Sequence, residues 1–133
     1  MKPTTLKQAL KKRLSTIEDA YSESGLPKVD FSVYPERLRV HRQASYEAIV
    51  IVEAARKIER EYGYGEIVWN NPEQNKYIPW FYMFPSGFAF GDSCYDDAIA
   101  AAGSGSRLHV LSVDASDRIG KTFVEVWEKV QLM

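Results

Sequence analysis

The sequence has a single cysteine, Cys94, and only two histidines, His41 and His109. One cysteine excludes an internal disulfide bond and is typical of a reducing compartment, so we expect a cytoplasmic protein. A metal centre of thiolate and imidazole ligands needs more such residues, at regular spacing, than this chain offers. The sequence therefore predicts neither a bound metal nor a cofactor.

The sequence also lacks long apolar runs and a large net charge. No stretch approaches the ~18 apolar residues that suggest a membrane span, and residues 1–14 contain no apolar segment of signal-peptide length. The formal net charge is −1, so overall charge attracts neither nucleic acid nor an anionic membrane. The charge is uneven, because residues 1–60 hold 12 Lys and Arg against 8 Asp and Glu, whereas residues 61–133 hold 5 against 10.

What the chain does have is the composition of an ordinary globular domain. Its 133 residues, 45% apolar and 26% charged, allow a core without disulfide bonds. Neither a linker nor a repeat divides the chain, so we predict one domain over residues 1–133. The aromatic content of 13% is concentrated in one segment, Tyr77–Phe90, which we call the aromatic hairpin.

Apolar residues at helical spacing predict three helices. The first covers about residues 6–21, and the second runs from Pro35 to about Glu61 with a break near residues 42–43. The second helix is apolar on all sides at Ile49–Val52, which places it in the centre of the core. The third begins at Asp114 or Ser116, either of which can cap it.

Short strands are predicted at residues 67–69, 77–84, 88–90 and 107–113, with the longest irregular stretch at residues 91–106. Residues 29–33 form either a further short strand or an extended lead-in to the second helix. Pro79 has no main-chain N–H, so its strand should lie at a sheet edge or begin its pairing late. Strands grouped between helices indicate an α+β fold. We expect a small antiparallel sheet of three to four strands packed against two or three helices.

One segment matches the loose pattern of a phosphate-binding loop, a small residue and four others before Gly120-Lys121-Thr122. Such a loop needs glycine and small residues to curl its amides around phosphate, whereas this one contains Asp117 and Arg118. Only 11 residues follow Thr122, too few for the later strand that brings the magnesium-binding acid. The pattern therefore does not predict a nucleotide site.

The parts available for nucleophilic catalysis are Ser93 or Cys94 with His109 as a base. A thiol or hydroxyl needs that base beside it, and nothing in the sequence brings His109 close. We therefore predict no catalytic residues, and the sequence favours a protein that is not an enzyme.

Alternation along residues 77–84 separates Trp80, Tyr82 and Phe84 from Tyr77, Phe81 and Met83 on the other face of the strand. One face must pack on the helices, and the other is a binding surface if it is exposed. Protein interfaces favour Trp, Tyr and Arg, so the predicted contacts to a protein partner are Trp80, Tyr82 and Arg107. The alternative is nucleic-acid binding by cations of the basic half, Lys7, Lys11, Arg13, Arg37, Arg39 and Arg42.

Several motifs together resemble a family of small uncharacterised proteins from gut Bacteroidetes and their phages and mobile elements. The motifs are Tyr77-x-Pro79-Trp80-Phe81, Ser86-Gly87-Phe88-x-Phe90, Gly105-Ser106-Arg107-Leu108 and Gly120-Lys121-Thr122-Phe123. The similarity covers about residues 30–125 and departs from the family pattern at Ile78, where that pattern has Tyr. It implies no activity or cofactor, only an accessory role linked to phages or mobile elements. We expect protein binding rather than catalysis, with a homodimer left open.

Overall fold

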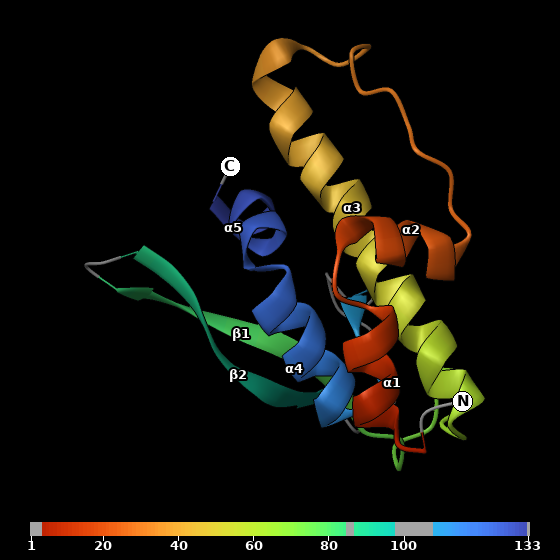
Figure 1. Cartoon of the computed structure of the whole chain (residues 1–133). Coiled ribbons are helices and arrows are strands. Elements are labelled where there is room, and N and C mark those ends of the chain that lie inside the picture. Colours follow the sequence, from red (N-terminus) through yellow and green to blue (C-terminus); the bar gives the residue numbers. More distant parts are fainter. Residues whose placement is uncertain (1–3, 85–86, 98–107, 133) are drawn as a thin grey trace.

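A computed structural model describes residues 4–84, 87–97 and 108–132. The elements of this part of the chain are α1 (Leu6–Arg13), α2 (Ile17–Ser24), α3 (Glu36–Glu61), β1 (Lys76–Phe84), β2 (Gly87–Asp97), α4 (Val113–Thr122) and α5 (Val124–Leu132). The chain thus mixes helix and strand, in agreement with the predicted α+β class. Figure 1 shows the helices gathered around α3, with the β1–β2 hairpin extending away from them.

The first predicted helix is in fact two, α1 and α2, so that prediction was wrong. Leu14 ends α1, and Thr16 begins α2 by accepting a hydrogen bond from the amide of Asp19, whose carboxylate in turn accepts from the amide of Thr16. This reciprocal capping box stabilises a new helix start. Both short helices face the same core, where Leu14 and Ala20 are fully buried. The apolar residues therefore recur across the break as they would in one helix.

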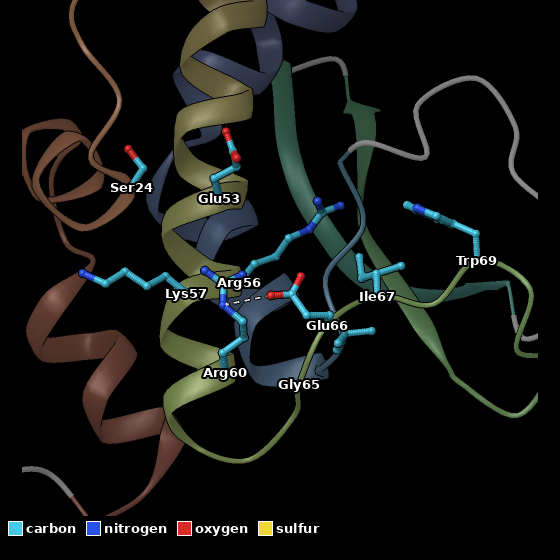
Figure 2. Close-up of a pocket in the computed structure, with 10 residues that line it drawn as sticks. Ser24, Glu53, Arg56, Lys57, Arg60, Gly65, Glu66, Ile67 and Trp69 are labelled. Atoms are coloured by element: carbon cyan, nitrogen blue, oxygen red, sulfur yellow. Dashed lines mark ion pairs between the residues drawn. The ribbon is translucent and has the colours of Figure 1, made fainter.

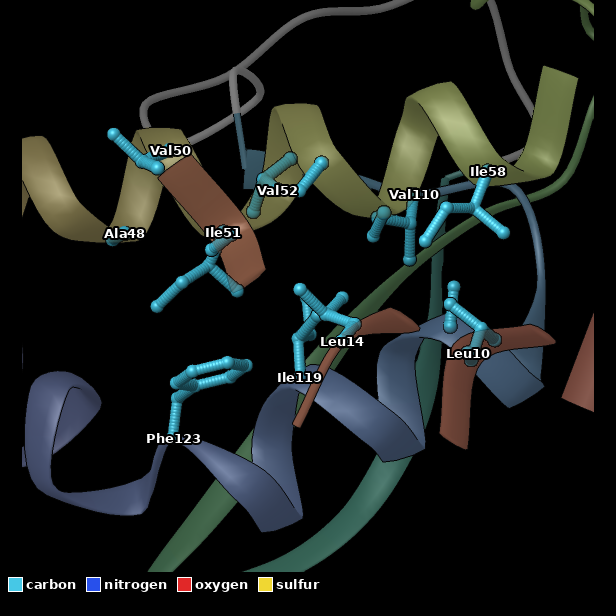
Figure 3. Packing of buried hydrophobic residues seen from close by; sticks show 14 of the residues in the cluster. Leu10, Leu14, Ala48, Val50, Ile51, Val52, Ile58, Val110, Ile119 and Phe123 are labelled. Carbon is cyan, nitrogen blue, oxygen red and sulfur yellow. The ribbon is translucent and has the colours of Figure 1, made fainter. Parts of the chain in front are cut away.

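The 26-residue helix α3 is the centre of the molecule. The predicted break near residues 42–43 does not occur, because no glycine or proline interrupts residues 36–61. Its predicted burial is confirmed. Figure 3 shows side chains of α3 facing those of α1 and α4, with buried members Leu10, Leu14, Val50, Ile51, Val52, Ile58, Val110, Ile119 and Phe123.

The last predicted helix is also two, α4 and α5, separated at Phe123. It begins earlier than predicted, because Ser112 rather than Asp114 or Ser116 is the cap and accepts a hydrogen bond from the amide of Ala115. The two helices stay joined by the Trp127 indole, which donates to the carbonyl of Ile119 at 3.0 Å.

The predicted sheet of three to four strands is reduced, in the described residues, to two antiparallel strands. Residues 29–33 and 67–69 are not strands, and β2 extends to Asp97, so residues 91–97 of the predicted irregular stretch belong to a strand. The rest of that stretch lies outside the described residues. In place of the predicted strand at 107–113 there is one bridge, in which Tyr77 and Val110 exchange main-chain bonds of 2.8 and 3.0 Å.

The third strand ends after one pair for two physical reasons. In an antiparallel ladder the next bonded pair on one side joins Pro79 to Leu108, and Pro79 has no N–H to donate. On the other side the next pair involves Ser112, which caps α4 instead. Within the described residues, Pro79 thus faces the side of β1 that has no ladder beyond this bridge, which agrees with the predicted edge position without testing it.

The β1–β2 hairpin lies across α4 and α5. The Phe81 ring stacks on Phe88 at 4.8 Å and meets Trp127 of α5 at 5.9 Å. Close to α4, a Cβ added to Gly120 would lie 2.4 Å from the Phe90 ring and 2.8 Å from the Cβ of Pro79. Only glycine therefore allows the hairpin to lie this close to the helix.

We predict that Gly120→Ala lowers the free energy of unfolding. Alanine is better than glycine inside a helix by about 1 kcal/mol. Overpacking against Phe90 and Pro79 costs about 1–3 kcal/mol and outweighs that gain. Urea unfolding of both proteins, repeated in a Phe90→Ala background, measures the balance. The loss should shrink when the ring is absent, and a more stable Gly120→Ala protein would refute the close contact.

Candidate functional site

An apolar groove of about 340 Å³ lies between the β1–β2 hairpin and the end of α5. Two of its residues, Met83 and Leu132, are 65% and 52% exposed. None of the described residues that line it is charged; they are Ile78, Pro79, Phe81, Met83, Phe88, Gln131 and Leu132. The groove is therefore suited to apolar atoms of another molecule.

The face of β1 that carries Tyr77 and Phe81 is the one packed against the core. Met83 follows on the same face, but it is exposed because the hairpin extends beyond the helices (Figure 1). The sequence pattern assigned Met83 to the same strand face as Phe81 but did not identify Met83 as a site residue. The only available signal was the alternation itself, which does not reveal where the covering helices end.

The predicted contacts Trp80, Tyr82 and Arg107 are placed only in part. Trp80 pairs with Asp92 and Tyr82 with Ala89 across the hairpin, while the side chains of Trp80 and Tyr82 are outside what the structure describes. Arg107 lies outside the described residues altogether. Their role stays a prediction.

A polar cleft of about 260 Å³ lies along one side of α3. Figure 2 shows residues of α3 facing the loop of residues 65–69, with Ser24 of α2 on the opposite rim. Spacings of three and four residues put the four contributing α3 side chains on one helix face. They are Glu53, Arg56, Lys57 and Arg60.

Each cation of this cleft has a defined neighbour. The Nε of Arg56 donates to the carbonyl of His109 at 2.7 Å. Lys57 lies 3.4 Å from Glu23, and Arg60 lies 3.5 Å from Glu66, whose side chain is 76% exposed. Arg56 is thus fixed by a main-chain group, whereas Arg60 has a loose surface ion pair.

Arg13, a predicted nucleic-acid contact, is held in an internal ion-pair network. Its guanidinium donates to both carboxylate oxygens of Glu23, at 3.0 and 2.6 Å, and lies 2.6 Å from Glu61. The hydrogen bond from Arg13 lowers the pKa of Glu23, and the pKa of Arg13 is raised by the same bond. These contacts join α1 to the ends of α2 and α3.

The other predicted cations fall into two separate groups. Arg39 donates to the carbonyls of Ser32 and Tyr34, and Arg42 lies over the Tyr34 ring. These two, with the exposed Arg37, are at the N-terminal end of α3, which Figure 1 shows far from α1. Lys7 and Lys11 of α1 instead line a cleft of about 170 Å³. Two cations of α4, Arg118 and Lys121, line it as well, although they were not among the predicted nucleic-acid contacts.

A buried carboxylate lies close to the polar cleft. Glu59 of α3 is fully buried and accepts hydrogen bonds from the amide of Leu111 at 3.0 Å and from the Ser112 hydroxyl at 2.6 Å. Burial raises the pKa of Glu59, and the hydrogen bond from Ser112 partly opposes that shift. Ser112 is buried and also caps α4, so this pair anchors the helix and offers no accessible nucleophile.

The remaining catalytic candidates are not assembled in what the structure describes. His109 is 4% exposed, and its ring meets Trp69 edge-on at 5.9 Å, while the side chain of Cys94 is outside the description. The segment Ala115–Thr122 belongs to α4, where amides bond within the helix, so it does not form a phosphate-binding loop.

Across residues 4–84, 87–97 and 108–132, no group of three or more His, Cys, Asp or Glu side chains is arranged to hold a metal. No helix within those ranges is long and apolar enough to cross a membrane. Comparison with protein-family models, curated proteins and solved structures found no match.

The raised pKa of Glu59 gives a testable dependence of stability on pH. Because this pKa is higher in the folded than in the unfolded protein, the stabilising contribution is complete below about pH 4, near the unfolded value. It is lost as the pH rises through the folded pKa. We predict that the free energy of unfolding of the wild type relative to Glu59→Gln falls over this window, as measured by urea unfolding from pH 4 to pH 8.

The matched control is Glu73→Gln, which removes one carboxylate from an exposed loop position. Its stability should follow that of the wild type across the same pH range. Parallel curves for wild type and Glu59→Gln would show that the buried carboxylate does not control the pH dependence.

Proposed function

We propose that this protein is a non-catalytic accessory protein that binds a partner protein in the apolar groove between the β1–β2 hairpin and α5. The observation that supports this most directly is the pair of exposed apolar side chains, Met83 and Leu132, in a groove whose described lining residues are all uncharged. Exposed apolar surface of this kind is typical of protein interaction sites.

The shape of the groove favours an extended segment of the partner. Its β1 residues run from Ile78 to Met83, five steps of ~3.4 Å along a strand, or about 17 Å. A stretch of about five extended residues with apolar side chains matches that length, and such segments bind beside exposed strands.

Two apolar anchors are too few for a tight complex. Complete burial of a Met or Leu side chain contributes about 1.5–3 kcal/mol, whereas association costs at least ~4 kcal/mol in lost freedom of motion. The proposal therefore keeps Trp80, Tyr82 and Arg107 as further contacts. Alternation along the sequence assigns Trp80 and Tyr82 to the face of β1 opposite Met83, so the partner has to reach around the hairpin. The family resemblance supports an accessory role linked to phages or mobile elements.

A photo-reactive amino acid in place of Met83 tests this proposal in the native host. We expect it to cross-link one partner protein reproducibly. The same group in place of Val33, which is 83% exposed on a distant loop, should not capture that partner. The partner, once purified, should bind wild type but bind Met83→Glu at least tenfold more weakly, because a carboxylate would be desolvated in the groove.

The thermal midpoint of Met83→Glu separates binding from folding. It should equal that of the wild type, because the Met83 side chain is mostly exposed. Equal capture at positions 83 and 33 would contradict the proposal. A product of twice the chain mass would identify a second copy of this chain as the occupant instead.

One observation favours nucleic acid as a second candidate, namely the cleft that unites Lys7 and Lys11 with Arg118 and Lys121. Two aspartates, Asp114 and Asp117, line the same cleft and weaken its positive charge. Phosphate contacts need several uncompensated cations, so this function ranks below protein binding.

If duplex DNA does bind at this cleft, affinity should fall steeply with salt. Each phosphate contact contributes about 0.9 to the slope of log affinity against log salt. The double variant Lys7→Gln, Lys11→Gln should reduce that slope by about 1.8, whereas Arg37→Gln, at the other end of the molecule, should leave it unchanged. Fluorescence anisotropy with a labelled duplex measures the slopes, and a flat response in wild type removes this candidate.

A further inference from the structure

The polar cleft on α3 contains an excess of positive charge. Three cations line it, Arg56, Lys57 and Arg60, against two carboxylates, Glu53 and Glu66. Figure 2 shows the Arg60 guanidinium between Lys57, on the side of α2, and Glu66, on the side of the loop. The charges of the described lining residues thus sum to +1.

Among the residues that the structure describes, Glu66 is the one loop residue that brings a charge to this cleft. It follows Gly63 and Gly65, which have φ angles of +92° and +75°, values that other residues adopt only with strain. The chain therefore turns sharply after α3 and returns the Glu66 carboxylate to Arg60. The pair is 3.5 Å long, with side chains 42% and 76% exposed, so it contributes little stability.

Lys57 is also weakly engaged. Its neighbour Glu23 is already bound by Arg13 through two hydrogen bonds, of 3.0 and 2.6 Å, which are shorter than the 3.4 Å to Lys57. Glu23 therefore keeps a strong partner if Lys57 turns toward the cleft. Arg56, in contrast, is oriented by the carbonyl of His109 and forms a fixed part of the wall.

We propose that this cleft binds a small molecule through a phosphate or carboxylate group, and that Glu66 occupies the place of that anion in the free protein. Guanidinium groups bind both kinds of anion in a bidentate manner. The anion displaces Glu66 from Arg60 and is shared with Lys57. Once the Glu66 carboxylate has left, the protein groups around the anion carry a charge of +2 instead of +1.

The volume and walls of the cleft restrict the ligand. About 260 Å³ lies just below the usual ~300–1,000 Å³ of small-molecule sites, which favours a small metabolite over a dinucleotide. Ile67 and Trp69 form an apolar wall opposite the cations, where the uncharged part of the ligand can pack. The site therefore matches a small phosphate monoester or carboxylic acid, and it is separate from the protein-binding groove.

Calorimetric titration with inorganic phosphate and with acetate, at constant ionic strength, tests the proposal and separates the two anions. We expect saturable binding of at least one of them to the wild type. Glu66→Gln should bind that anion on the order of two- to fivefold more tightly, because the competing carboxylate is gone. Arg60→Gln should weaken binding tenfold or more, because it removes the central guanidinium.

Glu73→Gln controls for the simple loss of a negative charge, because Glu73 does not line this cleft, and its affinity should equal that of the wild type. Unchanged thermal midpoints without anion would show that the variants fold. No saturable binding in the wild type, or equal affinities in wild type, Glu66→Gln and Arg60→Gln, would overturn the proposal. Tighter binding in Glu73→Gln as well would reduce it to a general charge effect and equally overturn it.

Discussion

The buried carboxylate of Glu59 ties the two halves of the chain together. It accepts from the amide of Leu111, 52 positions away in sequence, and from the hydroxyl of Ser112. Each buried donor left without this acceptor would cost about 1–3 kcal/mol. The neighbouring carbonyl of His109 accepts from Arg56, and Val110 bridges to Tyr77. The four consecutive residues 109–112 thus join α3, α4 and the hairpin. The packing of the hairpin on the helices depends on where these four residues lie.

This connection explains why the hairpin remains a narrow ribbon. Since Ser112 is committed to α4 and Pro79 has no N–H, the third strand stops at one bridge. The hairpin is then held mainly by its packing across α4, which Gly120 makes possible. Its far end extends beyond the helices, and this leaves Met83 and the apolar groove exposed.

The sequence predicted those features that depend on local pattern. The run Ile49–Val52, apolar on all sides, predicted the central helix of the core. The β propensity around Phe81 predicted a strand, and the missing N–H of Pro79 indicated where its pairing is limited. The residues of the Thr16 capping box are present in the sequence, but the apolar period continues across them and led to the prediction of a single helix. Glu59 was not predictable, because a helical glutamate next to Arg60 resembles a solvated surface charge until its partners, more than fifty residues away, are known. The same holds for the α3 cations, whose cleft exists only because the loop of residues 65–69 folds back over them.

The two candidate surfaces are chemically different but share this connection. Arg56 lines the polar cleft and also holds His109, and the next residue, Val110, fixes the hairpin to which the apolar groove belongs. Replacing Arg56 would therefore disturb both surfaces and could not assign a function to either. Arg60 and Met83 each line one surface and are exposed, and the bonds that hold residues 109–112 come instead from Arg56, Glu59 and Tyr77. For that reason they distinguish an anion site on α3 from a protein site on the hairpin.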